Sequence, residues 1–187
     1  MGVVEVVVTS LGDMALATEA FGRVTVDVPR ERWVEALTAA RDAAGCAYLD
    51  WLTAVDELPA GIALVAHVWC VGRREGVLLR TLLPPEDPAI ASATAVYAGA
   101  AWHERETYEM FGVVFDGHPG LVPLLLPDGF EGRPLRKEFV LASRAVRPWP
   151  GAKEPGDGEG GSPARRRLAP PGVPAASTWG ARPGSDP

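Results

Sequence analysis

The spacing of apolar and polar residues in the first part of the chain predicts two strands followed by a helix. Residues 3–8 and 23–28 are rich in β-branched side chains, and the second stretch alternates charged and apolar positions as a half-buried strand does. Residues 30–44 place apolar side chains near one helical face, after Pro29 and before Gly45. Because proline fits a first helical turn and glycine commonly ends a helix, this stretch predicts a helix of about four turns.

Three further apolar stretches predict strands at residues 48–55, 62–71 and 77–83. Turn-rich residues 57–61 and 72–76 separate them. Because short turns join antiparallel neighbours, we expect these strands to form an antiparallel meander.

The second half of the chain begins with a helical region and then becomes irregular. The proline-rich residues 84–88 end the meander, and a helix is predicted from about residue 92 to residue 111, stopped by Gly112. The expected fold class is α+β, with a mixed, largely antiparallel sheet packed with helices and an extended irregular C-terminal arm. The pattern does not determine the strand order.

The composition changes near the C-terminus and divides the chain in two. Of the 45 residues from Ser143 onward, 17 are Pro or Gly. Such a segment buries too little apolar surface to fold alone. We therefore expect one α+β domain over residues 1–141 and a Pro/Gly-rich tail over residues 142–187 that is disordered or wraps a partner subunit.

The predicted helix ending at residue 111 has two apolar sides. One stripe carries Trp102, Glu106 and Met110, and the opposite side gathers Ala101, Glu104, Tyr108 and Phe111. A surface helix of a single domain usually has one apolar stripe, so we expect this helix to lie between its own sheet and a second polypeptide.

Each of these stripes contains a carboxylate, and we expect Glu104 and Glu106 to be partly buried. Buried carboxylates need partners, and Arg105, Arg136 and Lys137 are the candidate cations. The leading interpretation is a structural ion network.

The composition narrows the classes of partner. The chain has 187 residues, 47% of them hydrophobic, and a formal net charge of −6. Its arginines form no basic stripe, so we expect no nucleic-acid partner. No signal peptide and no apolar run long enough for a membrane helix is apparent, so any membrane association should come through partner chains.

Catalytic and metal sites find little support in the sequence. Cys46 and Cys70 are too few to ligate an iron–sulfur cluster, and we expect them to be buried thiols. Residues 103–107 resemble a zinc-protease helix, but Thr107 stands where the second histidine belongs. Glu104 and Glu106 project to different sides of a helix, unlike a glycosidase pair. We therefore expect no catalytic, cofactor-binding or metal-binding residue on this chain.

Four linked motifs in residues 104–138 carry a family resemblance. The first comprises Glu104, Arg105, Glu106, Tyr108, Met110, Phe111 and Gly112, and the second Phe115, Gly117, His118 and Pro119. The third is Leu125-Leu126-Pro127, and the fourth comprises Glu131, Gly132, Pro134, Leu135, Arg136, Lys137 and Glu138. In this order they resemble the signature of the 30 kDa (C) subunit of respiratory NADH:quinone oxidoreductase, complex I. The resemblance covers about residues 20–141.

The chain departs from that signature at a few positions. Glu109 and Glu138 stand where the family commonly has Asp, and Arg133 where it often has His. Gly120 stands where an acidic or amide residue is frequent.

The resemblance implies a non-redox scaffold in the peripheral arm of a proton-translocating enzyme, on the cytoplasmic side of a bacterial cell membrane. The implied cofactors, FMN, iron–sulfur clusters and quinone, belong to partner subunits. The implied partners are the 49-kDa-type (D) subunit and the iron–sulfur subunits B and I. Trp102 and the residues of the first, second and fourth motifs, apart from Phe115, then become interface or structural residues.

Two other functional classes remain open. A chain of this fold also fits a membrane-bound hydrogenase or an F420H2 dehydrogenase, and the genes beside it would discriminate between these assemblies. A stand-alone hydrolase or metalloenzyme is the third alternative, which intrinsic hydrolysis or a stoichiometric metal would reveal.

Overall fold

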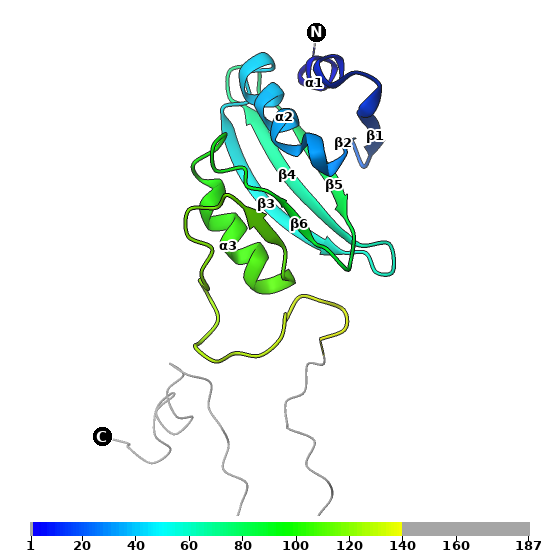
Figure 1. Cartoon of the computed structure of the whole chain (residues 1–187). Helices are drawn as coiled ribbons and strands as arrows, with labels where there is room; N and C mark the ends of the chain where they lie inside the picture. The colour runs from blue at the N-terminus through cyan, green and yellow to red at the C-terminus, as the bar shows by residue number, and fades with distance from the viewer. Residues whose placement is uncertain (1, 140–187) are drawn as a thin grey trace, which may run out of the picture. The chain divides into compact units, whose positions relative to one another are not determined.

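A computed structural model describes residues 2–139, and its centre is a five-stranded sheet (Figure 1). The strands are β1 (Leu16–Ala20), β2 (Arg23–Asp27), β3 (Tyr48–Asp56), β4 (Ile62–Cys70) and β5 (Glu75–Leu83). Their order is β1-β2-β5-β4-β3, and only β2 and β5 run parallel. The expected α+β fold with a mixed, largely antiparallel sheet is confirmed, as is the antiparallel meander of β3, β4 and β5.

The helices share a core with one face of this sheet. The helical elements are α1 (Val3–Leu11), η1 (Gly12–Met14), η2 (Arg30–Arg32), α2 (Trp33–Thr38), η3 (Ala39–Ala43) and α3 (Ala100–Phe111). Trp33 and Leu37 of α2 are fully buried in one apolar cluster with sheet residues such as Leu64 and Leu79. The helical run over residues 30–43 confirms the predicted helix.

The opposite face of the sheet is only partly covered by the described chain. Trp51, Trp69 and Leu78 are half-buried there, while Val55 and Leu82 are about half exposed, at 48% and 49%. The alternation along each strand separates these residues from the core-facing ones. The domain is therefore two-layered, with helices on one side of the sheet.

The N-terminal strand predicted at residues 3–8 is wrong, because this segment forms the helix α1. Val3, Val7 and Leu11, four residues apart, face the core and are at most 3% exposed. Burial of this helical stripe outweighs the weak helix propensity of valine. Glu5 also accepts a hydrogen bond from the N–H of Gly2 at 3.0 Å, which satisfies one unpaired donor at the helix start.

The helix predicted from residue 92 is also shorter than expected, since α3 begins at Ala100. Residues 89–91 instead form β6 (Ala89–Ala91), which pairs in parallel with β7 (Val114–Asp116). Turns fill residues 93–99. This two-stranded sheet joins segments on either side of α3, a pairing that local sequence pattern does not reveal.

None of the helices among residues 2–139 is long and apolar enough to cross a membrane. The predictions for residues 142–187 lie outside the residues that the structure describes.

Candidate functional site

Helix α3 and the irregular segment that follows it form one unit held by side-chain-to-backbone hydrogen bonds. We call residues 117–138 the strap. The last four carbonyls of any helix lack partners within the helix. At the end of α3 the Tyr108 carbonyl accepts the N–H of Gly112 at 2.9 Å, and the strap donates both to this carbonyl and to those of residues 109–111.

Three strap residues supply these bonds. Arg133 donates to the carbonyls of Tyr108 and Glu109 at 2.9 and 3.2 Å. The N–H of Leu135 donates to the residue 110 carbonyl at 3.3 Å, and Arg136 Nε donates to the residue 111 carbonyl at 2.6 Å. Two guanidinium groups thus lie at the negative end of the helix dipole, where cations are stabilising.

Glu109 anchors the middle of the strap to α3. Its carboxylate accepts the backbone N–H groups of Leu124, Leu125 and Leu126 at 3.2, 2.7 and 2.8 Å. Burial alone would raise the pKa of Glu109, but these three donors outweigh burial and the pKa is lowered. The side chain is therefore held as a carboxylate.

The start of the strap is fixed to the first half of α3. Arg105 donates to the carbonyls of Val122 and Pro123 at 2.9 and 2.7 Å. His118 Nδ1 accepts the N–H of Gly120 at 2.9 Å, which leaves Nε2 to donate to the carbonyl of Ala101 at 3.0 Å.

The end of the strap reaches the sheet at Asp56, the last residue of β3. The Asp56 carboxylate accepts the N–H of Lys137 at 2.8 Å and that of Leu58 at 3.0 Å. Burial would raise the pKa of Asp56, yet the two backbone donors lower it. Arg136 also pairs with Glu138 at 3.6 Å.

Glu104 is fully buried, but the expected cation network around it is wrong. Its carboxylate accepts hydrogen bonds from Ser92 Oγ and from the N–H of Ala93, each at 2.6 Å. Burial raises the pKa of Glu104, and these two donors only partly oppose it. Arg105 and Arg136 bind backbone carbonyls instead, and Lys137 contributes its N–H to Asp56.

The other stripe of α3 faces away from the core. Trp102 is 62% exposed, Glu106 is exposed and Met110 is half-buried. Glu106 is therefore not buried by this chain, and its burial against a second polypeptide stays a prediction. Arg105 lies over the Trp102 ring, with 5.2 Å between its Cζ and the ring centroid. The chain's own core covers one apolar side of α3 and leaves this stripe open.

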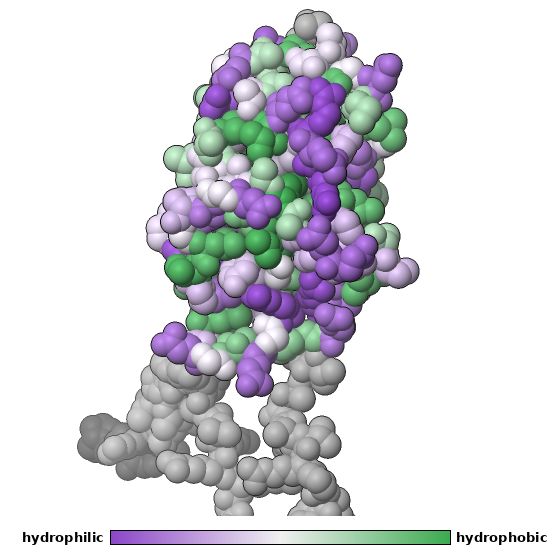
Figure 2. Space-filling model, viewed as in Figure 1, coloured by the Kyte–Doolittle hydropathy of each residue, from purple (hydrophilic) through white to green (hydrophobic). Residues whose placement is uncertain are grey.

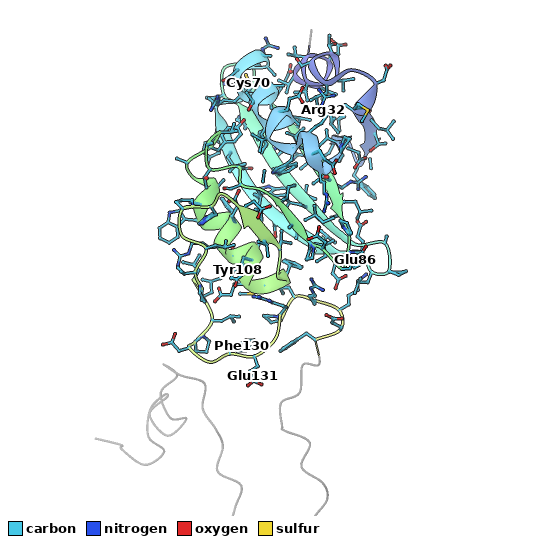
Figure 3. The ribbon with its side chains drawn as sticks, viewed as in Figure 1. Arg32, Cys70, Glu86, Tyr108, Phe130 and Glu131 are labelled. Atoms are coloured by element: carbon cyan, nitrogen blue, oxygen red, sulfur yellow. The ribbon has the colours of Figure 1, made fainter. Side chains whose placement is uncertain are left out.

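The strap also exposes large apolar side chains while its polar groups are bound to α3. Together with Trp102 these residues make up what we call the docking face: Trp102, Val122, Leu125, Phe130 and Leu135. They are between 41% and 62% exposed. Figure 3 shows Tyr108 on α3 above Phe130 and Glu131 of the strap, and Figure 2 shows apolar surface among polar side chains. Exposed apolar groups gathered on one unit are typical of a protein interface.

Glycines shape the turns of the predicted signature. Gly112 ends α3 with φ of 82°, and Gly117 and Gly132 have φ of 81° and 95°. L side chains rarely adopt this conformation, which accounts for glycine at these positions.

Most signature residues thus lie in one unit, and their role at a subunit interface stays a prediction. Three signature residues of the strap make no side-chain hydrogen bond with residues 2–139: Pro119, Glu131 and Pro134. Sequence reasoning missed the roles of Asp56, Ser92 and Arg133. Only Arg133 carried a signal, since it departs from the family pattern.

The described part of the chain has no cluster of side chains that could bind a metal ion. Residues 2–139 contain no group of three or more His, Cys, Asp or Glu side chains placed to hold a metal ion. Cys46 and Cys70 are buried free thiols, as expected. Burial, and to a lesser degree Cys70, raises the pKa of the Cys46 thiol to about 11, which keeps it protonated near neutral pH.

Comparison with known proteins agrees with the resemblance of the motifs. A family described as "Respiratory-chain NADH dehydrogenase, 30 Kd subunit" matches residues 26–145. The NADH-quinone oxidoreductase C subunit of Citrifermentans bemidjiense is 38% identical over 136 residues, which are 72% of this chain and 84% of the relative. The corresponding protein of Salinispora tropica is 38% identical over 130 residues, but these span only 53% of that longer relative.

Two solved structures share the fold. The trypsin-resistant fragment of Nqo5 has a TM-score of 0.59 and 28% identity, covering 65% of this chain and all of that one. A chain of the membrane-bound sulfane sulfur reductase, an archaeal respiratory membrane complex, has a TM-score of 0.64 and 20% identity, covering 81% of this chain and 95% of that one. The second likeness concerns the fold alone.

Proposed function

Since the chain belongs to the 30 kDa subunit family of respiratory-chain NADH dehydrogenase, we propose that it is a structural subunit in the peripheral arm of a proton-translocating NADH-quinone oxidoreductase. It carries no redox centre of its own in this proposal. FMN, the iron–sulfur clusters and the quinone site belong to partner subunits. The complex would sit with this arm on the cytoplasmic side of a bacterial cell membrane.

The observation that carries this proposal is that the strap binds its own chain through polar groups and exposes apolar side chains. Its polar contacts point inward to α3 and Asp56, while the docking face exposes Trp102, Leu125 and Leu135. A strap needed only for the chain's own stability would gain most by burying these apolar side chains. Their exposure supports a partner surface, which we assign to the 49-kDa-type (D) subunit, with the iron–sulfur subunits B and I as further neighbours.

The contribution to catalysis is geometric. Redox centres owned by different chains transfer electrons only when they are held at fixed separations, and a rigid interface provides this. The anchoring of the strap at Glu109, Arg133 and Asp56 supplies such rigidity on this side of the interface.

Leu125→Asp tests the proposal, with Leu16→Asp as the matched control. Leu125 is 60% exposed on the docking face, and Leu16 is 64% exposed on β1, outside it. The native complex is purified from membranes carrying each variant, and subunit stoichiometry and NADH:quinone reductase activity are measured. Leu125→Asp should lower both together, while Leu16→Asp should leave both unchanged. Full assembly of the Leu125→Asp complex with selective loss of turnover would contradict a scaffold role.

The likeness to a chain of an archaeal respiratory complex supports a second candidate, a subunit of a hydrogenase-type or F420H2-dependent complex. The same fold occurs in a sulfane sulfur reductase, so fold alone does not require NADH as the electron donor. The hydrogenase-type or F420H2-dependent alternative is tested by identifying the chains that copurify. A flavin-binding NADH subunit in the complex favours the proposal, and a hydrogenase or F420H2-oxidising subunit favours the alternative.

A further inference from the structure

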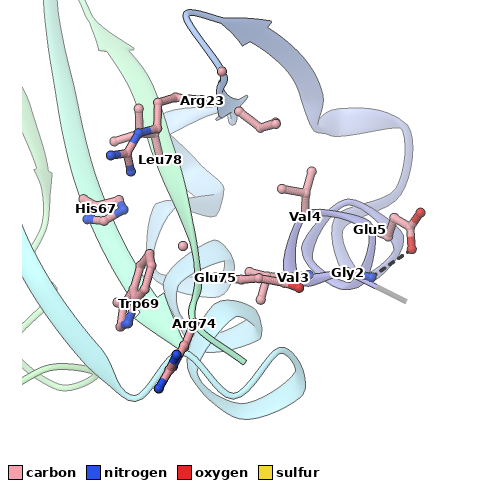
Figure 4. A pocket seen from close by; sticks show the side chains of 13 residues that line it. Gly2, Val3, Val4, Glu5, Arg23, His67, Trp69, Arg74, Glu75 and Leu78 are labelled. Atoms are coloured by element: carbon pink, nitrogen blue, oxygen red, sulfur yellow. Dashed lines mark hydrogen bonds between the residues drawn. The ribbon is translucent and has the colours of Figure 1, made fainter. Parts of the chain in front are cut away.

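A groove of about 510 Å³ lies outside the docking face, between α1 and the start of β5 (Figure 4). Val3 and Val4 of α1 line one side, and Glu75 and Gly76 of β5 line another. Arg23, at the start of β2, completes the rim. No residue of the strap contributes to it.

The groove opens onto an unpaired stretch of strand edge. The whole of β5, from Glu75 to Leu83, pairs with β4. β2 pairs with β5 only at residues 78–80. Residues 75–77 therefore have a strand neighbour on one side alone, and the groove lies along the other. An open edge of this kind offers backbone N–H and C=O groups to an added strand.

Two carboxylates and two guanidinium groups line the groove, so their formal charges balance, but only the arginines lack hydrogen-bond partners among residues 2–139. Both carboxylates accept backbone N–H groups at the start of α1. Glu5 accepts the N–H of Gly2 at 3.0 Å, and Glu75 accepts the N–H of Val3 at 3.1 Å. Arg23 and Arg74 are exposed, and neither has an ion pair or side-chain hydrogen bond with residues 2–139. Two guanidinium groups are thus free to bind carboxylates.

His67 also lines the groove. Its Nδ1 lies 2.9 Å from the carboxylate of Asp50, and its side chain is only 10% exposed. In the neutral tautomer that donates Nδ1–H to Asp50, Nε2 is a hydrogen-bond acceptor. Gly76 permits this placement, since a Cβ there would lie 2.6 Å from Nε2 and 2.6 Å from the Trp69 ring. Figure 4 shows His67 and Trp69 side by side beneath Arg23.

We propose that this groove binds a short, extended, acidic segment of another subunit of the same complex, which adds a strand beside residues 75–77 and places carboxylates against Arg23 and Arg74. The inference rests on the proposed function in taking the partner from that complex. Sites for small molecules usually enclose most of the ligand, whereas this groove is open and continues into smaller hollows beside Tyr48 and Trp51. Such a shape fits a chain segment better than a small molecule.

Site-specific photo-crosslinking in the purified complex tests the inference. A benzophenone amino acid is placed at Val4, which lines the groove, and in a control at Glu31, which is exposed on η2. We expect the Val4 position to crosslink to a peptide of another subunit that contains Asp or Glu, and the Glu31 position not to capture that peptide. The double change Arg23→Glu with Arg74→Glu should lower this crosslink at least ten-fold, and the double change to Lys should retain it.

Several outcomes would overturn the inference. Crosslinks only to residues 142–187 of the same chain, to a second copy, or to a segment without acidic residues would do so, as would no crosslink. A yield unchanged by charge reversal would remove the role of the two arginines. In each case a complex of normal composition leaves the proposed function standing, whereas a chain that does not copurify with partner subunits overturns both.

Discussion

The carboxylate of Glu109 on α3 accepts the backbone N–H of Leu125 in the strap at 2.7 Å, while the Leu125 side chain is 60% exposed. One residue of the strap is thus bound to the helix through its backbone and free to meet another protein through its side chain. The same Glu109 carboxylate holds the two neighbouring N–H groups. Strap anchoring and partner binding can therefore be changed separately.

Glu109→Gln should loosen the strap without removing the docking face. The amide retains one acceptor oxygen and loses the charge, so we expect the free energy of unfolding at neutral pH to fall by about 1.5–3 kcal/mol, the range for hydrogen bonds to charged groups. Urea denaturation of the purified chain measures this. Glu19→Gln, on the exposed strand β1, is the control and should change it by less than about 0.5 kcal/mol.

The effect of Glu109→Gln should also depend on pH. The pKa of Glu109 is lowered on folding, so its stabilisation is present above the pKa of the unfolded carboxyl, about 4.3, and is lost as pH falls through the folded value. The difference in unfolding free energy between wild type and variant should therefore shrink as pH falls below about 4. A difference that stays constant down to pH 2 would argue against a carboxylate bound by three N–H donors.

Glu104 should show the opposite pH dependence. Its pKa is raised on folding, so its contribution to stability is fully present below the unfolded pKa and is lost as pH rises through the folded value. Glu104→Gln keeps an acceptor for Ala93 and has no charge to bury, so its stability relative to wild type should increase as pH rises from about 4 toward neutral. Thermal unfolding across this range measures the trend, and parallel curves would contradict it.

Gly112→Ala should destabilise the end of α3. The residue has φ of 82°, and an added Cβ would lie 3.2 Å from Arg133 Nε. We expect a loss of about 1–2 kcal/mol, the cost of a left-handed conformation for an L residue. Gly120→Ala is the matched control, because it lies in open space. Equal stability of the two variants would show that the helix end does not depend on this conformation.

Arg136→Ala and Glu106→Ala separate folding from assembly. Arg136 is 14% exposed and donates to the carbonyl of Phe111, so its removal should lower the free energy of unfolding by about 1.5–3 kcal/mol. Glu106 is exposed on α3, so Glu106→Ala should change the free energy of unfolding by less than about 0.5 kcal/mol. If the open stripe contacts a partner, Glu106→Ala will nevertheless reduce the amount of chain in the purified complex. Wild-type incorporation of this variant would place the interface elsewhere on the chain.

The fold could be predicted where local pattern and burial agree. The strand at residues 23–28 and the meander show alternating or continuous apolar runs, and the helix at residues 30–44 shows one apolar face. Residues 3–8 failed because valine-rich sequence favours strands, whereas Val3 and Val7 gain more by packing as a helical stripe. Tertiary contact decided that segment, and no local signal records it.

The sequence drew attention to α3 and the strap but did not reveal the contacts within them. The two apolar sides of α3 and the four motifs lie in this unit, and their role at a subunit interface stays a prediction. Side-chain charges led to the expectation of ion pairs, yet Arg105 and Arg136 bind backbone carbonyls, and Glu104 binds Ser92 and the N–H of Ala93. Backbone donors and acceptors are the same at every position, so a sequence cannot show which ones a charged side chain will meet.

The four carbonyls at the end of α3 are all occupied by the strap before any other protein arrives. Conformational entropy lost in fixing this irregular stretch is therefore lost when the chain folds, not when the complex forms. A partner meets a preorganised surface, and the association free energy is not reduced by an ordering transition on this side. Irregular backbone here should consequently bind as a rigid body, with little change in heat capacity beyond that of the apolar area it covers.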